Sequence, residues 1–370
     1  MQGNNVLGIL FAYLHDARVR TLTQNRVMAS IPYGGRYRLV DFPLSNMVNS
    51  GINKIGIITE ENYLSLMDHL GSGKAWDLSR KNEGLSLLPP FGAKASHREG
   101  RIEAMDAIRR FIKTSREDYV LLGDCDLVAN IDYRQIFEFH SKSKADITLL
   151  YRRGDSPETE RNLVLTIDPE QVVREIYLKR GRDYDCNYGL GNYLMSKERL
   201  LKLIDDCMSR NLYDFERDVL QRFLPELRIC AYEFKDVAYS ITSFESFFNA
   251  NMALMDPRVR KALFRQDSPV YTKMRDDMPT RYGLGAQVKN SVIADGCVIE
   301  GEVENCVLFR GVKISKGAKV RNCVLMQDTQ IGEDVRLDYV VTDKNVSFTR
   351  EKTMMGYHSY PVYIEKGSVI

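Results

Sequence analysis

The chain from about residue 286 onward is constrained by a hydrophobic period of six. Aliphatic residues return at six-residue steps in five of seven cases, with one step of nine and one of five. Hexapeptide repeats of this kind are typical of a left-handed parallel β-helix, in which each hexad forms one face of a triangular coil. An ordinary antiparallel β domain would instead alternate every second residue. We therefore expect a left-handed β-helix over 286–370, with these side chains inside: Ile293, Ile299, Leu308, Ile314, Val320, Met326, Ile331 and Leu337.

Residues 1–255 follow another pattern, in which apolar runs of strand length alternate with helix-like segments. Such runs predict an α/β, Rossmann-like domain with a mostly parallel sheet covered on both faces. Ligands of these sheets bind beyond the carboxyl ends of the strands. Residues 256–285, which carry Pro257, Pro269 and Pro279, are expected to be a linker. The expected strands are 5–14, 54–60, 118–124, 146–152, 163–168, 174–179, 191–196 and 227–234, and the expected helices include 103–115, 197–208, 214–223 and 244–254.

The charge balance and the cysteine pattern exclude several classes of protein. The 52 Lys and Arg residues nearly cancel the 50 Asp and Glu residues, and no run of five like charges occurs. This balance argues against general binding to nucleic acid or to a membrane surface. The seven cysteines form no C-x-x-C pair, and H-E-x-x-H is absent, so a structural zinc site is not expected. Without a signal peptide or an apolar run long enough to span a bilayer, the chain is expected to be cytoplasmic.

A specific resemblance lies at residues 32–52. The run Pro-Tyr-Gly-Gly-Arg-Tyr-Arg-Leu-Val-Asp-Phe-Pro-Leu-Ser-Asn over 32–46, followed by Asn-Ser-Gly-Ile over 49–52, closely resembles ADP-glucose pyrophosphorylases. These sugar nucleotidyltransferases join a nucleotide-binding α/β domain to a C-terminal β-helix. They make ADP-glucose and pyrophosphate from ATP and glucose 1-phosphate. Their reaction needs a backbone cradle for the triphosphate, cations against the developing charge, and carboxylates that hold Mg²⁺.

The phosphate cradle of the family is altered in this chain. The family has a glycine-rich loop after its first strand, because side chains would keep phosphates away from backbone N–H groups. Here Tyr13 and Leu14 stand in place of the paired glycines, and Asp16 replaces the third. Only the arginine survives, as Arg18. The lysine of the family's Arg-Ala-Lys-Pro run is Met28, which cannot supply a phosphate-binding cation.

The resemblance also implies two metal-binding aspartates. Counting back from Asp132-Tyr133 places Asp126 at the first position, with Asp124 as a competitor that needs two inserted residues. The second position is Ser240, whose neutral hydroxyl is a poor ligand for Mg²⁺. Asp236, a few residues upstream, is a candidate to compensate.

Other pocket positions change in milder ways. The family's Gly-Thr-Ala-Asp-Ala, near the base and ribose, is Gly100-Arg101-Ile102-Glu103-Ala104, and its adenine-facing glutamine is Glu60. Its sugar-phosphate motif Glu-Lys-Pro reads Leu178-Lys179-Arg180, so Lys179 is kept for the phosphate and the sugar-binding carboxylate is lost. A solvated basic turn is the alternative for Lys179.

The chain lacks residues that serve several separate catalytic requirements, while the 32–52 signature is intact. In this pattern it resembles a noncatalytic paralogue within the family. That resemblance implies a regulatory subunit with no required cofactor, which associates with a catalytic ADP-glucose pyrophosphorylase subunit in a mixed tetramer and activates it in glycogen synthesis. A phosphorylated effector is expected at an anion site containing Arg26 and Arg38. The alternative is an active adenylyltransferase that uses Mg²⁺ with Arg18, Lys179 and Asp126. A third reading is a nucleotide sensor that binds ATP without reacting.

Overall fold

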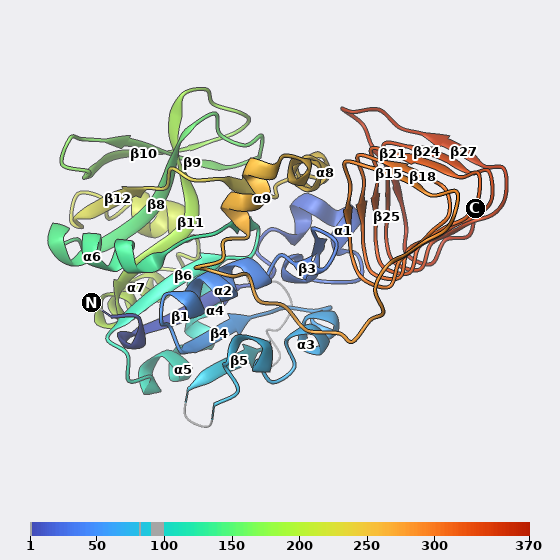
Figure 1. Cartoon of the computed structure of the whole chain (residues 1–370). Helices are drawn as coiled ribbons and strands as arrows, with labels where there is room; N and C mark the ends of the chain where they lie inside the picture. The colour runs from blue at the N-terminus through green and yellow to red at the C-terminus, as the bar shows by residue number, and fades with distance from the viewer. Residues whose placement is uncertain (1, 81–82, 90–99) are drawn as a thin grey trace.

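A computed structural model describes residues 2–80, 83–89 and 100–370 of the chain. An α/β domain carries the N-terminus, and a stack of β-helical coils carries the C-terminus (Figure 1). The helices α1 (Arg20–Thr23) and α8 (Phe244–Met252) lie between the central sheet and this stack. The fold class predicted from the sequence is confirmed: a Rossmann-like α/β domain is followed by a parallel β-helix.

The central sheet is built around β1 (Val6–Phe11), in which all six residues are buried. β1 pairs in parallel with β4 and with β6, and β4 pairs in parallel with β5. The later strands make the sheet mixed, because β11 runs antiparallel to both β6 and β8. The bounds are β4 Lys54–Ile58, β5 Gly84–Leu88, β6 Tyr119–Asp124, β8 Ile147–Gly154, β9 Asn162–Ile167, β10 Val173–Lys179, β11 Cys186–Ser196 and β12 Ile229–Glu233.

Two of the expected helices differ in form from the prediction. The segment 103–115 is divided at Ile108 into two short helices, and 214–223 contains a π-helix over Phe215–Gln221. The remaining helix bounds are α2 Asp41–Asn49, α3 Leu64–Leu70, α4 Arg101–Ala107, α5 Arg109–Thr114, α6 Tyr133–Ser143, α7 Lys197–Ser209 and α9 Pro257–Leu263.

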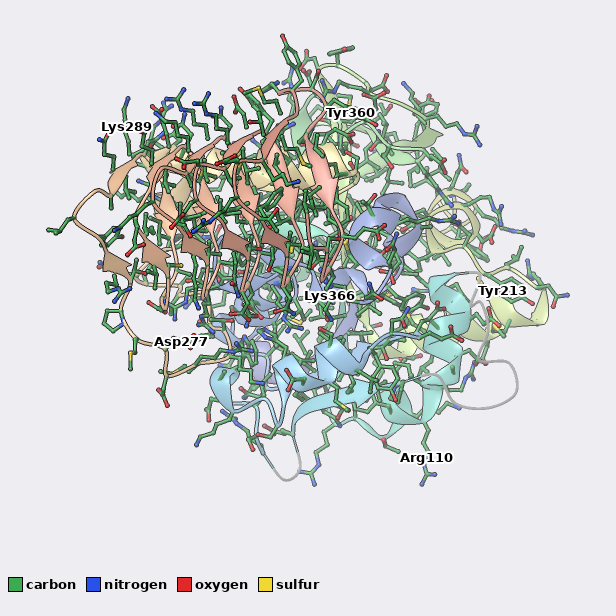
Figure 2. All side chains as sticks on the ribbon, turned by 90° about the vertical axis from the view of Figure 1, so that its right-hand side faces the viewer. Arg110, Tyr213, Asp277, Lys289, Tyr360 and Lys366 are labelled. Atoms are coloured by element: carbon green, nitrogen blue, oxygen red, sulfur yellow. The ribbon has the colours of Figure 1, made fainter. Side chains whose placement is uncertain are left out.

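The β-helix consists of three parallel sheets of five strands each. Ile299 pairs with Ile314, Ile314 with Ile331, and Ile331 with Phe348, so successive coils contain 15, 17 and 17 residues. Figure 2 looks onto this stack, with Lys289 of the first coil and Tyr360 of the last coil toward its opposite ends. The strands are β14 Arg281–Tyr282, β15 Gln287–Lys289, β16 Val292–Ile293, β17 Val298–Ile299, β18 Glu302–Glu304, β19 Val307–Leu308, β20 Lys313–Ile314, β21 Lys319–Arg321, β22 Val324–Leu325, β23 Gln330–Ile331, β24 Arg336–Asp338, β25 Val340–Thr342, β26 Ser347–Phe348, β27 Thr353–Met355 and β28 Val362–Ile364.

Because the coils differ in length, one residue that was predicted to point inward does not. The interior cluster of the β-helix contains Leu325, whereas Met326 packs in a second cluster with residues of the N-terminal domain. The three faces of a 17-residue coil contain five, six and six residues. The inward position that follows Val320 is therefore Leu325, five residues later. The predicted step of nine, between Ile299 and Leu308, contains Val303 as a further inward residue. The prediction for Met326 is therefore wrong, and the other positions in the series lie in or against the interior cluster.

The two parts of the chain share a buried apolar interface. Val307, Val324 and Val341, from three successive coils, pack in one cluster with Met28 and Phe248. Met28, the residue in place of the family's lysine, is therefore an apolar contact between the domains. The segment 256–285 contains α9 and joins the β-helix at β14, which pairs with β17.

All seven cysteines are free thiols. Among the helices of the described ranges, none is long and apolar enough to cross a bilayer.

Candidate functional site

A cavity of about 210 Å³ opens beyond the carboxyl ends of β1 and β6. This is the position at which ligands bind in open α/β sheets. The loop after β1, the start of α4, β11 and the π-helix all contribute to its wall. The lining includes Leu14, His15, Arg18, Gly100, Arg101, Asp124, Asp126, Arg161, Tyr193, Asp214, Glu216 and Ser240.

The loop after β1 is closed by its own hydrogen bonds. The backbone N–H of Asp16 donates to Tyr13 O at 2.9 Å, and that of Arg18 donates to His15 O at 3.0 Å. The Asp16 carboxylate accepts the backbone N–H of Met28 at 2.7 Å. Burial raises the pKa of Asp16 to about 7. The backbone donors of Asp16 and Arg18, of the kind that hold phosphates in a glycine-rich loop, are therefore engaged here within the protein.

Arg101 occupies the centre of the polar wall. Its Nη2 donates to Asp124 Oδ2 at 2.6 Å, its Nη1 donates to Oδ1 of the same carboxylate, and its Nε donates to Glu216 Oε1 at 3.1 Å. The guanidinium also lies over the rings of Phe11 and Tyr193, 5.0 and 5.7 Å from their centroids. A buried guanidinium held in two carboxylate pairs and two aromatic contacts is a fixed part of the wall.

Both aspartates that the sequence proposed for a metal lie in this wall. Asp124 is the last residue of β6, and His15 Nε2 lies 3.2 Å from its Oδ2 and 3.5 Å from Asp126 Oδ2. Burial raises the pKa of Asp126. For Asp124, the attraction of the Arg101 guanidinium overcomes the effect of burial and holds the pKa below its usual value.

The second metal position lies next to the first. β13 (Ala238–Ser240) runs antiparallel to β7 (Leu127–Ala129), so that Ser240 pairs with Leu127, and Ile241 N donates to Asp126 O at 2.8 Å. The two positions that the resemblance assigned to metal-binding aspartates, Asp126 and Ser240, therefore lie close together.

A magnesium ion does not fit this arrangement of donors. His15, Asp124 and Asp126 each offer one ligand atom within 4.8 Å of the others. Both oxygens of Asp124, however, accept hydrogen bonds from Arg101, and the second family carboxylate is a serine.

The remaining predicted pocket residues separate into two groups. Arg18 and Gly100 line the cavity, as do Leu178 and Ser240. The side chains of Glu60, Glu103 and Lys179 are not among the lining groups, and Lys179 Nζ forms an ion pair with Asp183 at 2.6 Å. Asp236 lines a different hollow together with Asp132, so it does not compensate for Ser240.

A second, smaller cavity of about 50 Å³ lies between the two domains and is strongly basic. Arg310 comes from the β-helix and is 8% exposed, and its Nε and Nη2 have no hydrogen-bond partner among the described residues. Asp277 Oδ2 lies 3.7 Å from that Nε. Burial lowers the pKa of Lys344 to about 7 and that of Arg38 to about 10. The charged lining residues are Arg36, Arg38, Asp68, Lys273, Arg275, Arg310 and Lys344.

Arg26 does not line the basic cavity. Its Nη2 donates to both carboxylate oxygens of Asp343, at 2.7 and 2.8 Å, and both side chains are buried. Of the two predicted anion contacts, Arg38 therefore faces the cavity and Arg26 connects the domains. Sequence reasoning missed Arg101, Arg310 and Lys344, because their partners and neighbours lie far away along the chain.

Comparisons with known proteins cover both parts of the chain. Residues 15–256 match the family described as nucleotidyl transferase, and residues 275–360 match the GlmU-like C-terminal hexapeptide family. The chain is 34% identical to the glycogen biosynthesis protein GlgD of Bacillus subtilis, over 100% of this chain and 98% of that protein. In Geobacillus stearothermophilus it matches both GlgD (37% identical, 86% of this chain and 83% of that protein) and a glucose-1-phosphate adenylyltransferase (32%, 85% and 83%). The chain thus belongs to the ADP-glucose pyrophosphorylase family of nucleotidyl transferases, as the motif at 32–52 indicated.

Proposed function

We propose that this chain is a regulatory, largely noncatalytic subunit of ADP-glucose pyrophosphorylase in glycogen biosynthesis. It associates in the cytoplasm with a catalytic paralogue, in a mixed tetramer, and raises the activity of that paralogue. This proposal rests on the polar groups of the cavity wall, which pair with one another. The loop after β1 is closed by its own hydrogen bonds, and Arg101 holds the carboxylate of Asp124. A triphosphate with its metal would have to break both sets of contacts.

The pattern of similarity supports the same role. The chain is more similar to GlgD than to the adenylyltransferase of the same organism, Geobacillus stearothermophilus, at 37% against 32% identity. That organism contains both kinds of chain. A partner for this protein would therefore be a paralogue with an intact glycine loop and loop lysine.

The basic cavity between the domains suits a phosphorylated effector. Six cationic side chains converge there with one carboxylate, Asp68, in the lining. Arg310 is buried with two donor nitrogens that lack hydrogen-bond partners among the described residues, and leaving such donors unsatisfied is costly. An anion in this cavity would pair them. Because Arg38 comes from the N-terminal domain and Arg310 from the β-helix, a bound anion would contact both domains.

The alternative function is an active glucose-1-phosphate adenylyltransferase. It is favoured by Arg18 and Asp126, which both line the cavity and are residues that this reaction would use. Against it stand the ion pair of Lys179 with Asp183 and the pair that Arg161 forms with Asp214 inside the cavity.

The experiment that separates these functions uses the purified chain, a catalytic paralogue, and the two coexpressed. ADP-glucose formation is measured with ATP, glucose 1-phosphate and Mg²⁺. The proposal predicts negligible turnover by this chain alone and higher turnover by the mixed complex than by the paralogue alone. Turnover by this chain alone at the level of the paralogue would refute the noncatalytic role, and an unchanged rate in the mixture would refute the regulatory one.

A further inference from the structure

Every N–H-bearing nitrogen of the Arg101 guanidinium is engaged in the cavity wall. Nη1 and Nη2 donate to the two oxygens of Asp124, and Nε donates to Glu216. The side chain is 5% exposed and lies against the rings of Phe11 and Tyr193. These three contacts use the planar guanidinium as one unit, because its donors are fixed as a fork.

The carboxylate that Arg101 holds is also part of a compact set of metal-ligand types. One atom each from His15, Asp124 and Asp126 lies within 4.8 Å of the others, a spacing that the ligands of a single ion can have. Carboxylate oxygens suit divalent manganese, and imidazole is a ligand of other divalent transition metals. The set thus has the composition of a cation site, and one of its three members is already bound to a cation of the protein.

We propose that Arg101 serves as an internal substitute for a divalent cation, and that His15, Asp124 and Asp126 form a latent metal site that Arg101 keeps closed. A divalent ion at Asp124 would compete with two charge-assisted hydrogen bonds and would lie close to a fixed positive charge. The protein thus neutralises the carboxylate at the end of β6 without a ligand. This inference deepens the proposed noncatalytic role, because it names the side chain that keeps the metal out.

The test replaces Arg101 by threonine, the residue that the family motif has at this position. Binding of Mn²⁺ to the purified full chain is followed by the loss of the electron paramagnetic resonance signal of free Mn²⁺. Wild type is expected to have no Mn²⁺ site that depends on Asp126, so Asp126→Asn should leave its Mn²⁺ binding unchanged. Arg101→Thr is expected to gain one Mn²⁺ per chain, at least tenfold tighter than any binding by wild type. The double variant Arg101→Thr/Asp126→Asn is expected to lose that site.

The matched control is Arg161→Thr. Arg161 pairs with Asp214 in the same cavity, so its removal also opens the wall and takes the ion-pair partner from a carboxylate, but the Arg101 contacts with Asp124 remain. This variant is expected to gain no Mn²⁺ site. An equal gain in Arg161→Thr would refute a specific role for Arg101.

Two further results would overturn the inference. One is a wild-type chain that binds Mn²⁺ at a site lost in Asp126→Asn, and this measurement decides the question even if Arg101→Thr does not fold. The other is a folded Arg101→Thr chain that binds no Mn²⁺. Failure here is distinct from failure of the proposed function: wild-type Mn²⁺ binding without turnover refutes the closed site alone, whereas turnover by the isolated chain refutes the noncatalytic role.

Discussion

The contact between Arg26 and Asp343 provides the sharpest test of how the two domains are held together. Arg26 follows α1 and Asp343 follows β25, and the two side chains are 4% and 3% exposed. Replacing Arg26 by alanine would leave the Asp343 carboxylate with two donors, the hydroxyl of Tyr363 at 2.8 Å and the backbone N–H of Lys344 at 2.7 Å.

The expected cost follows from burial. Removing one partner of a buried ion pair typically destabilises a protein by about 3–5 kcal/mol, because the other charge is left uncompensated. Since Tyr363 and the Lys344 N–H still donate to Asp343, we expect the lower end, roughly 3 kcal/mol, for Arg26→Ala. The Arg26 side chain also contributes buried surface, so the loss is not purely electrostatic.

Equilibrium unfolding in guanidinium chloride, followed by circular dichroism, measures this loss. Arg258→Ala is the matched control, because Arg258 pairs with Asp256 at a similar distance, 2.8 Å, but is 92% exposed. An exposed pair of that kind contributes about 0–1 kcal/mol. If Arg26→Ala lost no more stability than Arg258→Ala, the buried pair would not hold the domains as described, and Arg26 would be available for an anion.

The remaining predictions concern two titratable side chains and one buried arginine. Because burial raises the pKa of Asp16 to about 7, the folded chain binds more protons than the unfolded chain between about pH 4 and 7, so stability falls as pH rises through this range. Asp16→Asn should flatten the dependence of the melting temperature on pH, and an unchanged slope would contradict the assignment. Because the pKa of Lys344 is lowered to about 7, sulfate should bind the basic cavity more weakly at pH 8.5 than at pH 6, and Lys344→Met should remove most of that difference in a calorimetric titration. Arg310→Ala should weaken sulfate binding about tenfold or more, whereas Arg350→Ala, at an exposed ion pair, should leave it unchanged; equal effects would refute the anion site.

The features that the sequence predicted well are local or periodic. The hexad period identified the β-helix because each coil repeats the same inward positions, whatever the rest of the chain does. The prediction failed at Met326 because one face of a 17-residue coil has five residues, and the side chain at 326 turns toward the N-terminal domain instead. Loss of the glycine loop was evident at Tyr13, Leu14 and Asp16, which lie within four residues of one motif.

The features that the sequence did not predict depend on contacts between distant segments of the chain. Arg101 is 23 residues from Asp124 and 115 residues from Glu216, so nothing in its own neighbourhood shows that it fills the cavity wall. The motif showed only an arginine in place of threonine. Arg310 and Lys344 belong to the β-helix and approach Arg38 only because the coils pack against the N-terminal domain. The pairing of Arg26 with Asp343 spans 317 residues for the same reason.

The cavity beyond β1 and β6 is not expected to accept ATP with Mg²⁺. Isothermal titration calorimetry of ATP and Mg²⁺ into the isolated chain measures this binding. We predict no saturable heat that depends on Arg18 up to about 1 mM ATP, which corresponds to binding in this cavity weaker than roughly 4 kcal/mol. A one-to-one isotherm that is abolished by Arg18→Ala would contradict the claim, since it would place the nucleotide over the loop whose hydrogen bonds are closed in this structure.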